Sequence, residues 1–139
     1  MKIREPDKND FLKIRTLIEL FELDNRQLLK EQFLATSSQI GLIGFGRIRD
    51  YTTCSELCSL GVIEPQRYKG VGKQLVKALI QKAKNPLYLV CIIPDFFEPL
   101  GFTIVKKYPD ELKDKLEYCT SELVVEETYV VMKHEKNDD

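Results

Sequence analysis

The sequence has few of the residues that build a metal centre. It contains four cysteines and a single histidine, His134. The cysteines, at positions 54, 58, 91 and 119, form no CxxC pair, whereas a structural zinc site needs four cysteine or histidine ligands at short spacing. We therefore predict no metal, and we expect the cysteines to be small buried hydrophobic residues in a reducing compartment.

Long apolar runs and an excess of one charge are also missing. No apolar run approaches the roughly 20 residues that cross a bilayer, and the N-terminal stretch MKIREPDKND lacks the apolar core of a signal peptide. The formal net charge of −1 is not the basic excess typical of nucleic-acid binding. We therefore predict a cytoplasmic protein that binds neither membrane nor nucleic acid.

The residues that are present indicate one ordinary globular domain. Hydrophobic residues make up 43% of the 139 positions and charged residues 31%, enough for a self-sufficient core. We find no internal repeat and no linker, so we predict a single domain over residues 1–133. The last six residues, HEKNDD (134–139), are expected to be disordered.

The first half of the chain alternates strand and helix patterns. Residues 2–5 predict a short edge strand ended by Pro6, and Asp7 can cap a helix with apolar residues at helical period. A second, shorter helix is expected after the cap candidate Asn25. Three antiparallel strands of a meander are then predicted, at 33–36, 40–51 and 54–63.

The second half carries the clearest helix, at residues 69–85, which Pro86 ends. The apolar run Leu87–Ile93 predicts a central strand, and a strand, helix and strand in this order predict a parallel crossover. Asp95 and Glu98 are expected to form the capping box of a short helix. Further elements are predicted at 102–106 (strand), 110–118 (helix) and 128–133 (strand). The fold class is therefore α/β (α+β), with a mixed sheet of about six or seven strands and helices on both faces.

The segment Arg67–Gly72 joins a predicted strand to this long helix and carries two glycines. Gly70 lets the backbone approach an anion without a Cβ in the way, and Gly72 lets the helix pack close to the sheet. The free N–H groups of the first helical turn would face the anion, and Lys69 and Lys73 add positive charge. The segment is neither a Walker loop nor GxGxxG, because Gln74 and Leu75 follow. We predict a pyrophosphate site.

With these residues the sequence resembles a known family. Arg67-x-x-Gly70-x-Gly72 matches the [RQ]-x-x-G-x-[GA] signature of the GNAT superfamily of acetyl-CoA-dependent N-acyltransferases, and FFEPLGF at Phe96–Phe102 is similar to the family's FYEKLGF block. The resemblance spans nearly the whole chain, and it implies a GNAT-like three-layer fold with acetyl-CoA as the acetyl donor. The cofactor-binding residues that it implies are Leu60, Gly61, Val62, Arg67, Tyr68, Lys69, Gly70, Val71, Gly72, Lys73, Phe96 and Phe97.

The resemblance also implies roles in the chemistry. The pantetheine arm would bond to the backbone of Leu60–Val62 as an added strand. An attacking amine must lose a proton, and the family's catalytic glutamate often stands eleven residues before the motif, which is Glu56 here; the alternative is an outward-facing strand glutamate. Many members protonate the leaving thiolate with a tyrosine where this chain has Phe97, so either another donor serves or the thiolate leaves unaided.

Within the superfamily, the stretch ELCSLGVIEPQRYKGVGKQL with the later PDELKDKLEYC resembles the stand-alone N-acetylglutamate synthase type, although the further downstream cysteines of that type are absent. An amino-acid acceptor needs cations for its carboxylates. The candidates are Arg15, Arg47 and Arg49, each of which could instead be a solvated surface arginine.

We therefore predict an N-acetyltransferase that acts on a small-molecule primary amine, with a glutamate-like amino acid as the favoured acceptor. Two alternatives stay open: acetylation of a protein lysine or N-terminus, and a non-catalytic acetyl-CoA-binding module. Exposed sheet edges in such folds often pair, so a homodimer is possible.

Overall fold

The computed structural model describes residues 2–64, 67, 70–122 and 128–135. It separates into two compact units, the first made of residues 1–49 and 57–82 and the second of residues 50–56 and 83–139. The elements up to residue 82 are β1 (Ile3–Arg4), α1 (Lys8–Leu20), the 3-10 helix η1 (Lys30–Gln32), β2 (Phe33–Ser38), β3 (Gly41–Asp50), β4 (Ser55–Val62) and α2 (Val71–Lys82). Those that follow are β5 (Leu87–Cys91), α3 (Pro94–Phe97), the 3-10 helix η3 (Glu98–Leu100), β6 (Phe102–Ile104), α4 (Asp110–Glu122) and β7 (Val130–His134).

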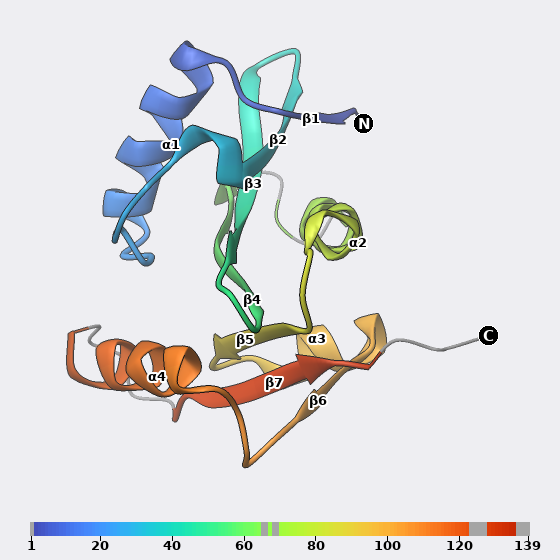
Figure 1. Ribbon diagram of the computed structural model, residues 1–139. Coiled ribbons are helices and arrows are strands. Elements are labelled where there is room, and N and C mark those ends of the chain that lie inside the picture. Colours follow the sequence, from blue (N-terminus) through green and yellow to red (C-terminus); the bar gives the residue numbers. More distant parts are fainter. Residues whose placement is uncertain (1, 65–66, 68–69, 123–127, 136–139) are drawn as a thin grey trace. The chain divides into compact units, whose positions relative to one another are not determined.

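The strands form a mixed seven-stranded sheet with hydrogen-bonded order β1-β2-β3-β4-β5-β7-β6 (Figure 1). Strands β1, β2 and β3 pair in antiparallel fashion, as do β5 with β7 and β7 with β6. The β4 to β5 connection is parallel, as the crossover through a helix requires. The predicted mixed sheet with β1 at its edge is confirmed.

In the first unit, α1 begins where the sequence predicts. Asp7 accepts a 2.8 Å hydrogen bond from the Asp10 backbone N–H, and the Asp10 carboxylate accepts a 2.9 Å bond from the Asp7 N–H. This reciprocal capping box satisfies two donors at the helix start. The inward side of α1 carries Ile14 and Ile18, both fully buried against the ring of Phe45 and its neighbours on β2.

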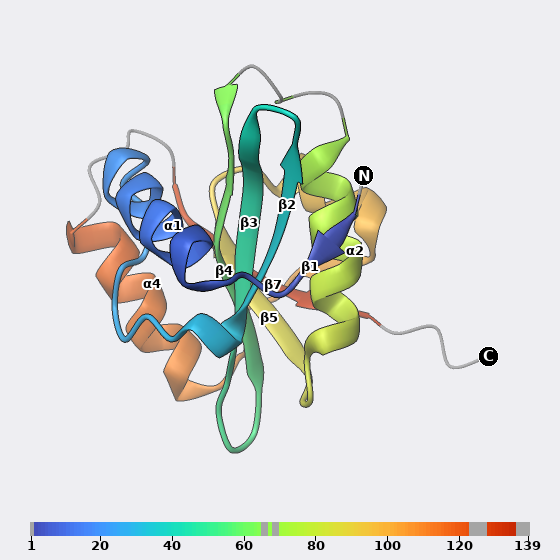
Figure 2. The same cartoon turned by 90° about the horizontal axis from the view of Figure 1, so that it is seen from above.

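Helix α2 packs on the other face of the same strands, as Figure 2 shows. Phe45 points toward α1, and its neighbours Gly44 and Gly46 face the opposite way because side chains alternate along a strand. A Cβ at Gly44 would lie 2.9 Å from Leu75 Cδ1, and one at Gly46 would lie 2.7 Å from Leu79 Cδ1. These two strand glycines therefore permit the close approach of α2.

The second unit has its own hydrophobic core, to which α4 contributes. Leu112 of α4 is fully buried and packs in a cluster with Cys54, Tyr88 and Val131. Tyr88 and Val131 belong to β5 and β7, which pair directly through Val90 and its neighbours. The helix thus covers these two antiparallel strands (Figure 1).

The structure corrects three sequence-based expectations. The helix expected after Asn25 is absent from the described residues 21–29, and the chain there has an irregular course before η1. Gln27 has a φ of +51°, which a helix does not tolerate. Asp95 is inside α3, whose cap residue Ile93 makes no side-chain cap bond, so the expected capping box is wrong. His134, expected in the disordered tail, is instead the last residue of β7.

Two further expectations concern buried thiols and membrane spans. All four cysteines are buried, as predicted. Within the described ranges, no helix has both the length and the apolar character that crossing a bilayer requires.

Candidate functional site

The predicted pyrophosphate site includes the turn that carries Gly70, which we call the glycine turn. It lies directly before α2. Gly70 has a φ of +83°, a left-handed conformation that strongly favours glycine, and a Cβ at Gly70 would meet no heavy atom within 4 Å. Glycine is therefore required here by backbone conformation, and the space beside it is open. The Gln74 N–H closes the first helical turn on the Gly70 carbonyl at 3.1 Å.

The other predicted residues of this turn have different environments. Val71 is buried against β3 and β4 in the first unit, so its side chain serves packing, while Lys73 is exposed and Gly72 is half-buried. Tyr68 and Lys69 lie outside the described residues.

Arg67 connects the turn to two other elements of the first unit. Its Nε donates a 2.8 Å hydrogen bond to the carbonyl of Val62 at the end of β4. Its guanidinium carbon lies 5.1 Å from the ring centroid of Phe21, the residue that ends α1, within the range of a cation–π contact. Arg67 therefore contacts the end of β4 and the end of α1, and these two contacts position the residue that precedes the glycine turn.

The predicted pantetheine strand is the last part of β4. The parallel ladder with β5 uses Ser55 and Glu56 of this strand, and residues 60–62 take no part in it. Gly61 is placed by packing, because a Cβ there would lie 2.6 Å from the Phe45 ring. Leu60 and Val62 are half-buried.

The two phenylalanines of the FFEPLGF block lie in α3 of the second unit. Their rings meet edge to face, with centroids 4.9 Å apart, and the ring of Phe97 lies 5.7 Å from that of Phe102. Phe97 is 5% exposed. It occupies a packed aromatic cluster and has no proton to donate.

Glu56, the predicted base, is fully buried in the second unit rather than facing outward. Its Oε1 accepts a 3.0 Å hydrogen bond from the Tyr51 hydroxyl, and its Oε2 lies 3.2 Å from Nζ of Lys115 on α4. The Lys115 side chain is only 5% exposed. Oε2 accepts no hydrogen bond from a described residue, so its lone pairs can still receive a proton.

The pKa of Cys54 reflects two properties of the surroundings of Glu56: they exclude water and they carry negative charge. Burial, together with the nearby carboxylates of Glu111 and Glu56, raises the pKa of the Cys54 thiol to about 11. Since the thiolate is the nucleophilic form, this cysteine stays protonated and unreactive at neutral pH. Burial likewise raises the pKa of Cys91 to about 11. Neither thiol is suited to carry an acyl group.

The predicted acceptor arginines fall into two environments. Arg15 is exposed on α1, with its guanidinium carbon 6.0 Å from the ring centroid of Phe11. Arg47 and Arg49 are buried on β3, where both approach the carboxylate of Asp24 at 3.7 and 3.6 Å. The structure thus brings Arg47 and Arg49 together at Asp24, whereas Arg15 lies apart from them on the exposed side of α1.

Arg47 has no exposed surface, and the protein itself uses its donors. Its hydrogen-bond partners, at 2.9 to 3.3 Å, are Ser59 Oγ, Gln32 Oε1 and the carbonyls of Asp24, Arg26 and Gln27. These bonds hold the segment that connects α1 to β2. They also explain why no helix forms after Asn25, since the carbonyls of Arg26 and Gln27, which a helix would use, bind a side chain.

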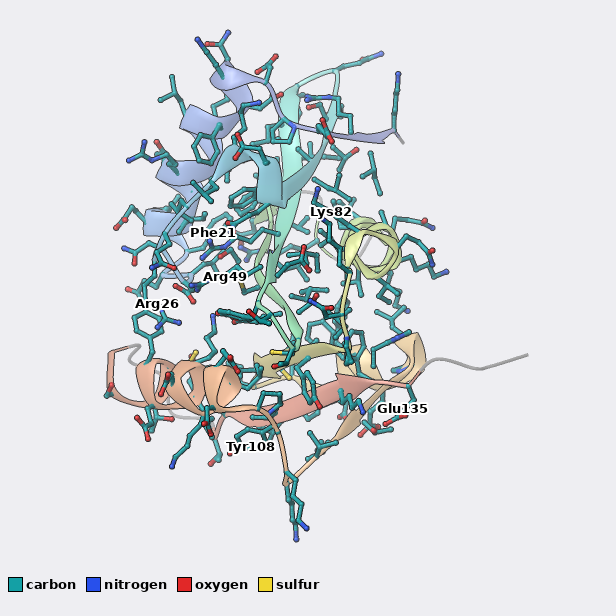
Figure 3. The ribbon with its side chains drawn as sticks, viewed as in Figure 1. Phe21, Arg26, Arg49, Lys82, Tyr108 and Glu135 are labelled. Carbon is teal, nitrogen blue, oxygen red and sulfur yellow. The ribbon has the colours of Figure 1, made fainter. Side chains whose placement is uncertain are left out.

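Arg49 and Arg26 approach the same carboxylate. Arg49 donates a 2.9 Å hydrogen bond to Gln27 Oε1, and Arg26 reaches Asp24 through two bonds of 3.0 and 3.1 Å. Figure 3 shows Arg26 and Arg49 at the same end of the first unit. Three guanidinium groups therefore surround one buried carboxylate, and we name this set, Asp24 with Arg26, Arg47 and Arg49, the arginine cluster.

The sequence-based reasoning missed Asp24 and Lys115. A signal for Lys115 exists, because it stands in the apolar stripe of α4 at helical spacing from Leu112 and Cys119, both buried. A lysine in such a stripe predicts a buried charge with a partner. Asp24 carries no such signal, because its segment has no regular period.

A pocket of about 380 Å³ in the second unit is separate from these residues. It is lined by Lys84, Asn85, Pro86, Leu87, Lys133, His134 and Glu135. None of the predicted cofactor, base or acceptor residues contributes to its lining.

Comparison with known proteins gives a family match and several similar solved structures. The sequence model of the acetyltransferase (GNAT) family matches residues 4–102. A search of curated proteins finds no match. Among solved structures, N-acetylglutamate synthase from Neisseria gonorrhoeae, complexed with coenzyme A and N-acetyl-glutamate, is similar with a TM-score of 0.75 and 18% identity over 96% of this chain. This chain spans only 34% of that protein.

Two further structures are similar over almost their whole length. The Mycobacterium tuberculosis protein Rv2747, in complex with CoA and NLQ, gives a TM-score of 0.80 with 16% identity, covering 99% of this chain and 100% of its own. Naa50 from Arabidopsis thaliana, in complex with the bisubstrate analogue CoA-Ac-MVNAL, gives 0.68 with 12% identity, covering 97% and 98%. At such identities the likeness concerns the fold. The family match over most of the sequence shows that the chain belongs to the acetyltransferase (GNAT) family.

Proposed function

We propose that this acetyltransferase moves an acetyl group from acetyl-CoA to the primary amine of an amino acid that carries a side-chain carboxylate. The observation that carries the proposal is the arginine cluster, in which three guanidinium groups share one carboxylate. The Arg49 side chain is 9% exposed and that of Arg26 34%. A site with this excess of positive charge favours an anionic acceptor over a neutral amine.

The cofactor would be held by residues of the first unit. The open space beside Gly70 and the start of α2 suit a diphosphate, because the N–H groups of a first helical turn face outward with a partial positive charge. Backbone groups of Leu60–Val62 suit an extended pantetheine arm. When bound, acetyl-CoA supplies the thioester carbonyl that the amine attacks.

Glu56 would take the proton that the acceptor ammonium must lose, directly or through a water molecule. The amine nitrogen then forms a bond to the acetyl carbon, the C–S bond breaks, and the thiolate leaves with the electron pair. The nitrogen loses a second proton as the amide forms, so that one of its two protons neutralises the thiolate and the other passes to solvent. A glutamate-to-glutamine change keeps the shape of the side chain and removes the base.

The acceptor is tested by mass analysis of products from acetyl-CoA and pooled amino acids. We expect acetylated glutamate or a close analogue to dominate. Arg49→Met should raise the KM for that acceptor roughly tenfold or more, the loss of one charged hydrogen bond, while Arg15→Met, on the exposed face of α1, should change it little. A lysine-peptide product with no amino-acid product would contradict the proposal.

The base is tested by Glu56→Gln. We expect kcat to fall by about 10²–10⁴, the usual contribution of a general base, with the affinity for acetyl-CoA retained. Full turnover in this variant would remove Glu56 from the mechanism.

The cofactor site is tested by two matched glycine variants. Gly70 and Gly41 both have positive φ, +83° and +110°, and a Cβ would meet nothing within 4 Å at either. Gly70→Ala and Gly41→Ala should therefore cost similar stability, about 1–2 kcal/mol. Only Gly70→Ala should weaken acetyl-CoA binding in calorimetry. Equal affinities in both variants would place the diphosphate elsewhere.

A further inference from the structure

We infer that Lys115 of α4 is a positioning residue for the Glu56 carboxylate in the acetyl transfer. The inference rests on the proposed function, in which Glu56 takes the proton of the acceptor amine. Lys115 is not part of the glycine turn, of the FFEPLGF block or of any role that the family resemblance assigns. It acts through Glu56.

The contact itself is well defined. Lys115 Nζ lies 3.2 Å from Glu56 Oε2, with the two side chains 5% and 0% exposed. On the other side of the carboxylate, the Tyr51 hydroxyl donates to Oε1 at 3.0 Å. Oε1 thus has a hydrogen-bond donor and Oε2 faces an ammonium, and contacts on both sides favour one orientation of the carboxylate.

Tyr51 is itself held in place within the second unit. Its backbone N–H donates to the Cys54 carbonyl at 2.8 Å, and the Asn85 side chain donates to the Tyr51 carbonyl at 2.7 Å. The support on the Oε1 side is therefore part of a rigid hairpin. The support on the Oε2 side comes from α4, a different element.

Stability alone does not account for this pair. Removing two charges from water costs more than an ordinary ion pair returns, and well-packed apolar residues can often replace a buried pair without loss. The lysine stands in the apolar stripe of α4, with fully buried Leu112 three residues before it. An apolar residue there would continue the stripe, so the charge indicates a role beyond packing.

The geometry of Oε2 agrees with that role. It is close to the Lys115 ammonium but accepts no hydrogen bond from the described residues. The contact is therefore an ion pair without a hydrogen bond, and a lone pair on Oε2 stays available for the incoming proton. A partner that occupied Oε2 with a strong hydrogen bond would compete with the substrate.

The test compares Lys115→Met with Lys113→Met, since Lys113 is exposed on the same helix. Turnover is measured with acetyl-CoA and pooled amino acids. We expect Lys115→Met to lower kcat at least tenfold with little change in the KM for acetyl-CoA, and Lys113→Met to change neither. Lys115→Arg should restore part of the loss, because it keeps the charge.

Combining the change with Glu56→Gln separates positioning from a structural role. If Lys115 acts through Glu56, adding Lys115→Met to Glu56→Gln should change kcat by less than about threefold, the non-additivity of coupled residues. An equal loss in both backgrounds would overturn the inference. Full turnover by Glu56→Gln would refute the base itself, whereas loss in Glu56→Gln with none in Lys115→Met would refute only the role of Lys115.

A spectroscopic readout makes the test independent of the acceptor. The ¹³C-carboxyl signal of Glu56, assigned by its absence in Glu56→Gln, should shift in Lys115→Met and not in Lys113→Met. If Lys115→Met does not fold, Lys115→Gln is measured in the same way. An unshifted signal in a folded Lys115 variant would overturn the inference.

Discussion

The two compact units bury charge in different ways. In the first unit, Arg47 has five hydrogen-bond partners, and they belong to three stretches of chain. In the second unit, Glu56 and Lys115 meet as an ion pair whose Oε2 accepts no hydrogen bond from a described residue. The first arrangement is saturated, and the second has unused capacity at a charged oxygen.

This difference separates Arg47, which holds the backbone around it, from Glu56, which can still exchange a proton. A guanidinium whose donors all meet carbonyl and hydroxyl oxygens fixes the backbone that supplies them, as Arg47 does for the segment before β2. A carboxylate with a free lone pair can still exchange a proton, as Glu56 can. We therefore expect changes in Arg47 to act mainly on folding and changes in Glu56 mainly on turnover.

The largest expected effect comes from removing Arg47, whose donors are all used. Arg47→Met leaves several buried oxygens and the Asp24 carboxylate without their donor, so we expect the free energy of unfolding to fall by about 3–5 kcal/mol. Arg26→Met is the matched control, because Arg26 binds the same carboxylate with a side chain that is 34% exposed, and it should cost at most about 1 kcal/mol. Urea unfolding of both variants measures the contrast. Equal losses would show that burial is not what matters.

A smaller effect concerns another ion pair, Arg4 with Asp10, which is only partly buried. The hydrogen bond from Arg4 lowers the pKa of Asp10 from 3.8 to about 2. A carboxyl whose pKa is lowered on folding stabilises above its unfolded pKa, and this contribution is lost as the pH falls from about 4 to 2. We expect a loss of about 1–2 kcal/mol, because the 34% exposed Arg4 side chain is screened by solvent.

Unfolding of the wild type and of Asp10→Asn between pH 5 and pH 2 checks this expectation. The stability of the variant should depend less on pH over that window, because the titrating group is gone. Parallel curves for the two proteins would show that other carboxyl groups account for the acid sensitivity.

The smallest expected effect tests the contact at Oε1 of the Glu56 carboxylate. Tyr51→Phe removes the hydroxyl that bonds to Glu56 Oε1 and leaves the Lys115 contact intact. We expect a loss of about 0.5–1 kcal/mol in the free energy of unfolding, the usual net contribution of one hydrogen bond. The fall in kcat should be smaller than in Lys115→Met. A larger fall would make Tyr51, rather than Lys115, the main support of the carboxylate.

Much of the fold follows from local patterns in the sequence. The Asp7 cap, the strands of the meander, α2 before Pro86 and the parallel crossover were all predictable, because each depends on residues within one short window. The helix expected after Asn25 was wrong for a non-local reason: Arg47, twenty or more positions later, binds the Arg26 and Gln27 carbonyls that a helix would have used.

The residues of the candidate site also differ in whether a local sequence pattern points to them. Gly70, Arg67 and Phe97 are candidates from motif spacing, and Glu56 is a candidate from its distance to the motif. The partners of Glu56 and the sharing of Asp24 by three arginines could not be identified, since no local pattern reports which distant side chain will meet a buried charge.

Local patterns were enough to identify a GNAT acetyltransferase with a glycine turn before a long helix, since propensity, capping and motif spacing are properties of neighbouring residues. The folded chain was needed to show that Arg47 holds the segment before β2 and that Lys115 meets Glu56, 59 positions away by sequence number. A buried charge must find a partner, and which partner it finds depends on where the folded chain returns.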